Sequence, residues 1–133
     1  MKIQALLFLS VFLFSCGNKI EKNEFEIAIE RVVKRLNANN FIVGENDEKV
    51  KGQTQTKRIF SVEIYGCKGI DLMDRSLKPE MKSFASEIKN TYSGIETIEK
   101  IKIKLVKDPN DKTPSKSGLY IQEKGFTFDL EEL

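Results

Sequence analysis

The stretch that decides the fold is residues 98–106, which reads Ile98-Glu99-Lys100-Ile101-Lys102-Ile103-Lys104-Leu105-Val106. Successive side chains of a β-strand point to opposite faces of a sheet, so alternation of apolar and charged residues is typical of a half-buried strand. Here Ile101, Ile103 and Leu105 fall on one face, and three lysines fall on the other. We therefore predict a strand with a core face and a lysine face.

Residues 79–93, which precede this strand, have the periodicity of a helix. An apolar stripe recurs at steps of three and four residues: Met81, Phe84, Ala85, Ile88 and Tyr92. Pro79 fits the first position of a helix, where its missing N–H is not needed. Gly94 stands where a C-terminal cap is expected.

Residues 58–65 alternate in the same way as residues 98–106, with Phe60, Val62 and Ile64 separated by Ser61 and Glu63. The segment is predicted to be a strand. A strand, a helix and a second strand in this order favour a right-handed parallel crossover between 58–65 and 98–106.

Residues 24–38 form the other predicted helix. Its apolar stripe consists of Phe25, Ile29, Val32, Val33 and Leu36. Asn23 and Glu26 have the spacing of a capping box. Residues 41–43 are predicted to be a short strand, and the polar residues 45–57 are either its continuation as a hairpin or a loop.

The C-terminal part contains two more apolar segments, 119–121 and 126–128, after a polar loop over 108–117. Both segments are strand candidates. Gly125 between them predicts a tight turn or a bulge. The last residues, Glu131 to Leu133, are expected to fray.

Together these elements predict an α+β fold. The expected architecture is a two-layer sandwich with two helices packed on one face of a four- to five-stranded mixed or antiparallel sheet. The opposite face would carry five polar side chains: Ser61, Glu63, Lys100, Lys102 and Lys104. A chain of this length buries one core, so residues 24–133 are expected to form a single domain.

The N-terminus has a different pattern. Lys2 precedes an apolar run over residues 3–14, and the run ends at Leu13-Phe14-Ser15-Cys16. The run is shorter than the ~20 residues that a spanning helix needs. The pattern resembles the signal sequence and lipobox of bacterial lipoproteins.

That resemblance implies a signal peptide over 1–15, a lipidated Cys16 as the first mature residue, and a short tether over 16–23. It implies a lipid-anchored protein of the cell envelope, and Gly17 after the cysteine favours the outer membrane. The alternatives are an ordinary secretory signal followed by a coincidental cysteine, or a short N-terminal anchor.

Composition limits the partners and the chemistry. Without residues 1–15 the chain has 21 basic and 20 acidic residues, a balance that argues against a nucleic-acid partner. With Cys16 lipidated, Cys67 has no partner for an intramolecular disulfide and is interpreted as a small, partly buried core residue. There is no histidine, so neither the usual general base nor a common zinc site is expected, and we predict no cofactor.

Two acidic segments are functional candidates. Asp71 and Asp74 are spaced so that they could act as acid and base on one helical turn, but such residues more often cap a turn. Asp108-Pro109-Asn110-Asp111 begins like a calcium loop, whose later positions are then filled by unsuitable residues. We interpret it as a turn and predict no metal site.

The lysines Lys100, Lys102 and Lys104 are the most distinctive interaction candidate. Such a row is usually a solvated face or a guard against edge pairing. The functional alternative is a cationic patch that meets anionic lipid or an acidic partner. The polar segments 45–57 and 108–117 are further surface candidates.

The preferred functional hypothesis is a non-enzymatic, membrane-anchored module that binds an envelope protein, for example as an immunity or inhibitor protein. The first alternative is an accessory lipoprotein that binds a small molecule or glycan. The second is a hydrolase that depends on carboxylates.

Overall fold

The computed structural model describes residues 23–49, 51–52 and 54–133, and Cys16 with its surrounding pattern lies outside them. Within the described residues, two helices and four strands follow one another as α1 (Glu24–Arg35), β1 (Asn40–Lys49), β2 (Thr56–Cys67), α2 (Leu77–Thr91), β3 (Lys100–Lys107) and β4 (Glu123–Asp129). Short 3-10 helices follow α2 at Ile95–Thr97 and β4 at Leu130–Glu132.

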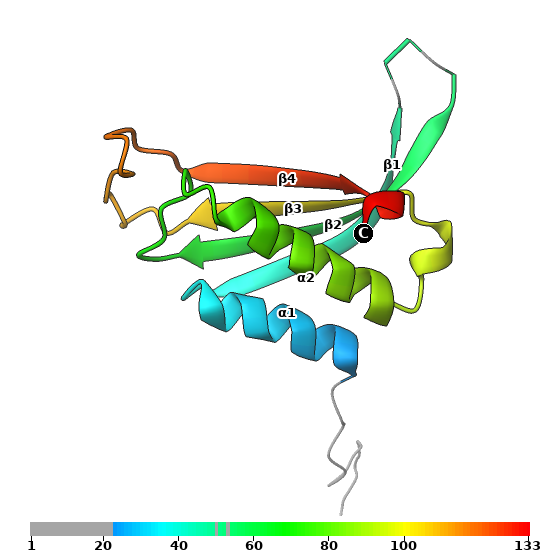
Figure 1. Ribbon diagram of the computed structural model, residues 1–133, viewed down its shortest axis with the longest axis horizontal. Helices are drawn as coiled ribbons and strands as arrows, with labels where there is room; N and C mark the ends of the chain where they lie inside the picture. Colours follow the sequence, from blue (N-terminus) through cyan, green and yellow to red (C-terminus); the bar gives the residue numbers. More distant parts are fainter. Residues whose placement is uncertain (1–22, 50, 53) are drawn as a thin grey trace, which may run out of the picture.

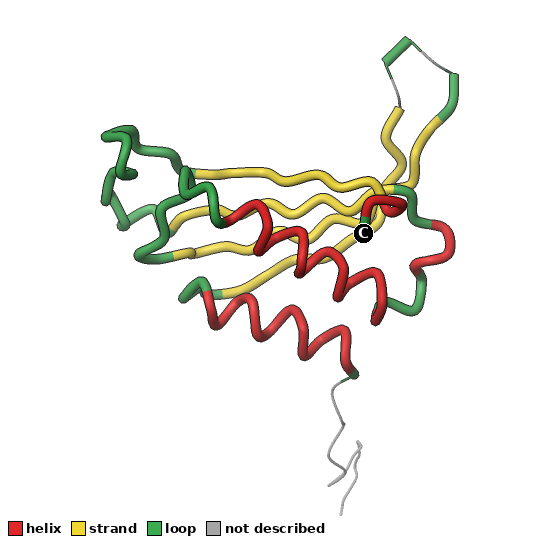
Figure 2. The backbone as a smooth tube through the Cα atoms, viewed as in Figure 1, coloured by secondary structure: helices red, strands yellow, loops and turns green. Residues whose placement is uncertain are grey.

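The four strands form one mixed sheet in the order β1-β2-β3-β4. β1 is antiparallel to β2, β2 is parallel to β3, and β3 is antiparallel to β4. Both helices lie on one side of this sheet (Figures 1 and 2). The α+β sandwich expected from the sequence is confirmed, with four strands and a parallel β2–β3 pair joined through α2.

The core lies between the helices and the sheet. The alternate residues of β2 and β3 that face the helices, such as Val62, Ile64 and Ile103, are completely buried. The helices contribute Ile29 and Val32 from α1, and Met81, Phe84, Ala85 and Ile88 from α2. Burying each large apolar side chain contributes about 1.5–3 kcal/mol, so the predicted stripes are what hold the two layers together.

The N-terminal cap of α1 agrees with the sequence, but its end does not. The Asn23 side chain accepts a hydrogen bond from the Glu26 N–H at 2.8 Å, as predicted. The helix ends at Arg35 and not at 38, because Asn37 adopts a left-handed φ of 52°. The Ala38 N–H then donates to the Val33 carbonyl at 3.0 Å, which closes a Schellman motif.

The predicted boundaries of α2 are also corrected. The helix begins at Leu77, so Pro79 is its third residue and not its first. Pro79 is tolerated there because the first N–H groups of a helix have no intrahelical acceptor. Tyr92 caps the C-terminus in an extended conformation, whereas Gly94, the predicted cap, has an ordinary φ of −90° and begins a 3-10 helix.

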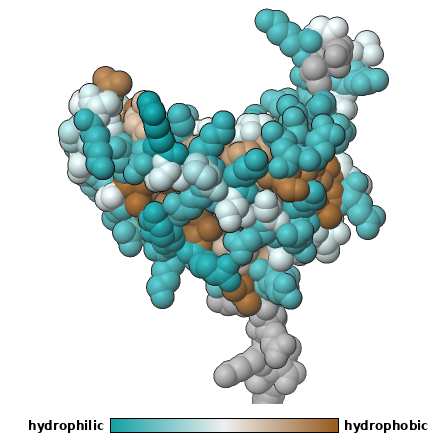
Figure 3. All heavy atoms as spheres, viewed as in Figure 1, coloured by the Kyte–Doolittle hydropathy of each residue, from teal (hydrophilic) through white to brown (hydrophobic). Residues whose placement is uncertain are grey.

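The polar segment 45–57 belongs largely to a β-hairpin. The β1–β2 register runs from the Asn40–Tyr65 pair to the Lys49–Thr56 pair, so the hairpin alternative of the prediction is correct. Its tip projects beyond both layers (Figure 1), and mostly hydrophilic residues cover it (Figure 3). Arg58 contacts Glu45 at 3.0 Å and Asp47 at 3.3 Å across the hairpin.

Three expectations for the C-terminal part are wrong. Residues 119–121 are outside any strand, and Gly125 makes no bulge because it pairs in register with Lys104. The last residues do not fray. The Asp129 N–H donates to the Glu132 carboxylate at 2.9 Å, and Lys89 donates to the carbonyls of Leu130 and Leu133 at 3.2 and 2.8 Å.

Candidate functional site

The face of the sheet that carries no helix, here called the open face, is the first candidate. Lys100, Lys102 and Lys104 lie on it, and their side chains are 30–47% exposed. Ser61 and Glu63 of β2 pair directly with Lys102 and Lys104 of β3. The five residues predicted to share this face therefore do share it.

Each of the three lysines has a carboxylate partner. The Lys100 ammonium lies 3.7 Å from Asp129, that of Lys102 lies 3.3 Å from Glu48, and that of Lys104 lies 3.4 Å from Glu123. The acids come from β4 on one side and from β1 on the other. The open face is thus a pattern of both signs, and it suits a partner whose charges alternate in the complementary way.

A shallow hollow of about 440 Å³ lies on the open face. It is lined by Val62, Ile103 and a set of polar or small residues: Asn46, Ser61, Glu63, Lys102, Lys104, Glu123, Gly125 and Thr127. At its margin the Tyr65 hydroxyl donates to Glu63, and this hydrogen bond, with burial, raises the pKa of Tyr65. No aromatic ring lines the hollow, so it offers no surface on which a sugar could stack.

Asp71 and Asp74 bind backbone N–H groups. Asp71 accepts from Met73 at 2.9 Å and from Lys116 at 3.0 Å. Asp74 accepts from the Ser76 N–H at 2.9 Å, and this hydrogen bond lowers the pKa of Asp74. A carboxyl group that acts as a general acid at neutral pH needs a raised pKa. The geometry therefore supports turn capping, the alternative weighed for this pair.

The 108–111 segment is a turn, held by its own backbone and by Lys107. Asp111 accepts from the N–H groups of Gly69 at 2.9 Å and Thr113 at 3.1 Å, which lowers its pKa to about 2. The buried Lys107 ammonium donates to the Thr113 carbonyl at 3.0 Å and lies 3.8 Å from Asp111. Within the described residues, no three Asp, Glu, Cys or His side chains are grouped so that they could hold a metal ion.

Cys67 is buried at the end of β2. Burial raises the pKa of its thiol, although the neighbouring cations of Lys107 and Lys68 oppose the shift. A thiol in this state is a poor nucleophile at neutral pH. The position agrees with the interpretation of Cys67 as a core residue.

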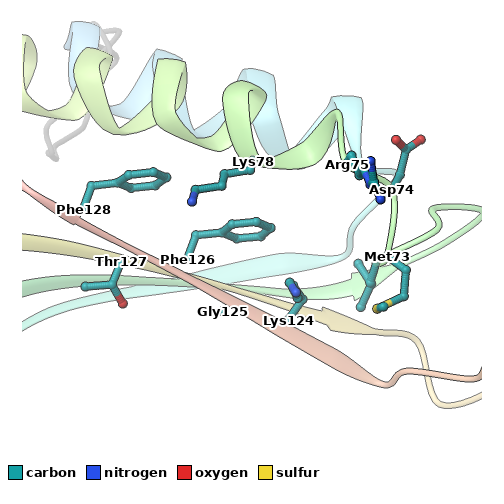
Figure 4. A pocket seen from close by; sticks show the side chains of 10 residues that line it. Met73, Asp74, Arg75, Lys78, Lys124, Gly125, Phe126, Thr127 and Phe128 are labelled. Carbon is teal, nitrogen blue, oxygen red and sulfur yellow. The ribbon is translucent and has the colours of Figure 1, made fainter. Parts of the chain in front are cut away.

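A second hollow, here called the β4 groove, was not anticipated from the sequence. It encloses about 420 Å³ between the start of α2 and β4, and is lined by Leu72, Met73, Asp74, Arg75, Lys78 and residues 124–128 (Figure 4). Its three cations, Arg75, Lys78 and Lys124, are scattered in the sequence and follow no period. The fold alone brings them to one place.

Comparison with protein-family models, curated proteins and solved structures finds no match for this chain. Among the described residues there is no helix with the length and apolar character needed to cross a membrane.

Proposed function

We propose that this chain is a small lipid-anchored protein of the cell envelope whose folded domain binds another protein and performs no catalysis of its own. The N-terminal pattern that ends at Cys16 supports the anchor. In this proposal Cys16 carries the lipid, and Gly17 directs the protein to the outer membrane. More than one acyl chain on Cys16 would make the anchoring stable.

The open face of the sheet is the observation that carries the proposal. Its side chains project from four hydrogen-bonded strands, so their relative positions are fixed before any partner arrives. Charges arranged in this way add more to specificity and orientation than to raw affinity. A partner whose positive and negative charges alternate in the complementary order would be recognised, and a partner with charges of a single sign would not. An immunity or inhibitor protein, which must distinguish one target from many, needs this kind of surface.

The hydrogen bonds of the two candidate catalytic carboxylates, Asp71 and Asp74, argue against hydrolysis. Asp71 and Asp74 are occupied by backbone N–H groups at 2.9–3.0 Å. The sequence contains no histidine that could replace them as a base. These contacts support the binding proposal over the hydrolase alternative.

Binding of a small molecule or glycan is the second candidate, and the hollow of about 440 Å³ on the open face is the observation in its favour. Ligand pockets of this size are usually mostly apolar and enclose most of the ligand surface. This hollow is lined mainly by polar groups and has no aromatic side chain. A thermal-shift screen of metabolites and glycans tests it directly.

The decisive experiment is site-specific photocrosslinking in cells. A photoreactive residue placed at Ser61 samples the open face, and the same residue at the exposed Lys82 of α2 samples the helical face. We expect one protein to be crosslinked from position 61 and not from position 82. Equal products from both positions, or none from position 61, would remove the open face as the binding surface.

A Cys16→Ser chain exported by an unrelated signal tests the contribution of the anchor. If the same partner is crosslinked without lipid, the folded domain alone carries recognition and the lipid sets only the location. If the partner is lost, the membrane itself takes part in recognition.

A further inference from the structure

Among the described residues β4 is an edge strand and pairs with β3 alone. The hydrogen bonds just outside the β4 register, Lys107 N–H to Gln122 at 2.8 Å and Leu130 N–H to Glu99 at 3.0 Å, fix the phase of the ladder. Because hydrogen-bonded pairs alternate along an antiparallel ladder, the N–H and C=O groups of Gly125 and Thr127 point away from β3. Asp129 belongs to the same set, and its N–H accordingly turns outward to Glu132.

The outward edge of β4 is also one wall of the β4 groove. Residues 124–128 line the groove on one side, and Met73, Arg75 and Lys78 line it on the other. In Figure 4, Phe126 and Phe128 point from β4 toward α2, whereas Thr127 points to the opposite side of the sheet. A chain lying along this edge would have free backbone partners on β4 and side chains of α2 above it.

The groove carries an excess of positive charge. Arg75, Lys78 and Lys124 line it, and none of the three has an ion-pair partner among the described residues. The only acid in the lining, Asp74, accepts a hydrogen bond from Ser76, and its carboxylate points away from β4 in Figure 4.

Lys78 stands at an unfavourable place for stability. It is in the first turn of α2, where the helix dipole disfavours a cation and favours an acid. The position therefore gives the helix no benefit, but it directs an ammonium group into the groove (Figure 4).

Gly125 pairs with Lys104 and adds no side chain beside the outward edge of β4. A Cβ atom built at Gly125 would meet nothing within 4 Å, so the fold does not require glycine there for space. A glycine inside a strand often marks a place where another backbone approaches closely.

From these contacts we propose that the β4 groove binds an extended, acidic segment of a partner protein, which adds to β4 as a fifth strand. Backbone hydrogen bonds to Gly125 and Thr127 would hold the segment in register. Its carboxylates, on every second residue, would face Arg75, Lys78 and Lys124. This inference is independent of the open-face proposal, since it rests on a strand edge and on three different cations.

A second copy of this chain fits the groove less well. The residues of β4 that face the helices are Lys124, Phe126 and Phe128. A second β4 on this edge would therefore bring Lys124 toward Arg75 and Lys78 without any carboxylate on that side. Like charges brought together in this way disfavour the pairing.

The test uses the full chain in detergent micelles and a labelled peptide as long as β4, made of alternating glutamate and valine. We expect saturable binding by fluorescence anisotropy. Arg75→Glu or Lys78→Glu should each weaken it about tenfold, because a charge-assisted contact is replaced by repulsion. Lys82→Glu, the same change one turn further along α2 and outside the groove, should alter it less than about twofold.

Two further peptides separate strand addition from simple charge attraction. A peptide N-methylated at every second amide keeps its charge but loses one edge of hydrogen bonds, and we expect it not to bind. A peptide of alternating lysine and valine should not bind either. Equal binding of the methylated peptide, equal effects of Lys78→Glu and Lys82→Glu, or concentration-dependent self-association that excludes the acidic peptide would overturn the proposal.

Discussion

The open face, with Lys100, Lys102 and Lys104, and the β4 groove, with Arg75, Lys78 and Lys124, lie on the two sides of β4. On the open face Lys100, Lys102 and Lys104 each have a carboxylate within 3.7 Å. In the groove, Arg75, Lys78 and Lys124 have no such partner among the described residues. A row of lysines in a sequence is therefore a poor guide to the net charge of the surface they form. The neighbouring strands decide whether each lysine is compensated by a carboxylate.

The difference has a structural cause. The three lysines of β3 have strands on both sides, and acids on β4 and β1 reach them. Glu48 reaches Lys102 from β1, across β2. The groove cations lie at the boundary of the sheet, where within the described part of the chain no further strand stands beside β4 to supply a carboxylate.

The largest effect is expected at a lysine that β3 turns toward the core. Lys107 is only 4% exposed and is held by Thr113 and Asp111, whereas the Lys104 side chain is 40% exposed. Lys107→Ala should lower the free energy of unfolding by about 3 kcal/mol, because Asp111, whose side chain is only 12% exposed, and the Thr113 carbonyl lose a cationic partner, and the buried stem of Lys107 loses its packing. Lys104→Ala should cost less than about 1 kcal/mol. Urea denaturation measures both, and equal costs would mean that burial does not separate the two lysines.

The next effect is a dependence on acid pH. The folded-state pKa of Asp111, about 2, is below its ordinary value of 3.8. A carboxyl group with a lowered folded pKa stabilises the protein above its unfolded pKa, and the stabilisation is lost as the pH falls through the folded pKa. The Asp111 contribution should therefore be complete above about pH 5 and disappear toward pH 2. In thermal melts Asp111→Asn should be less stable than the wild type at pH 6, and this difference should shrink steadily below about pH 4 and be mostly lost at pH 2. A gap that stayed constant with pH would exclude this carboxylate as its source.

A smaller change in stability is expected when the charge of one lysine is reversed on each of the two surfaces. Lys102→Glu replaces an attraction to Glu48 by a repulsion and should cost about 1 kcal/mol. Lys78→Glu breaks no observed ion pair and places an acid in the first turn of α2, so stability should be unchanged or rise by up to about 0.5 kcal/mol. Chemical denaturation of the two variants gives the comparison directly. A similar loss in both would contradict the distinction between paired and unpaired cations.

The smallest effect is the change that salt makes in the stability difference between Lys102→Glu and Lys78→Glu. Raising the ionic strength from about 0.1 to 1 M shortens the screening length from ~10 to ~3 Å. Most of the cost of Lys102→Glu should then disappear, while the stability of Lys78→Glu relative to the wild type should change little. If the cost of Lys102→Glu persists at high salt, it arises from packing of the side-chain stem and not from charge.

Much of the fold could be predicted because its signals are local. The alternation in 98–106 and 58–65 and the stripes of the two helices predicted the elements and their buried faces. The boundaries of the two helices were set by local capping that was misjudged, and the errors in the C-terminal part fall where a non-local contact decides. Residues 131–133 are held by Lys89 of α2, and Gly125 stays in register because it pairs with Lys104.

The candidate sites were predictable to different degrees. Alternation alone placed Lys100, Lys102 and Lys104 on one face. Their acidic partners were not predictable, because Glu48 and Lys102 are far apart in the sequence. The β4 groove left no recognisable pattern, since Arg75, Lys78 and Lys124 come from a loop, a helix and a strand.

The amino-acid sequence by itself determined the types of the elements, the faces they bury and the N-terminal pattern ending at Cys16. These properties follow from periods of two and 3.6 residues and from a short motif, which are independent of the rest of the chain. Only the tertiary structure decided which lysines are neutralised, which strand edge stays free and which cations meet beside it. Those properties depend on strand order and register, because electrostatic contacts of a few ångströms join residues that are distant in the chain.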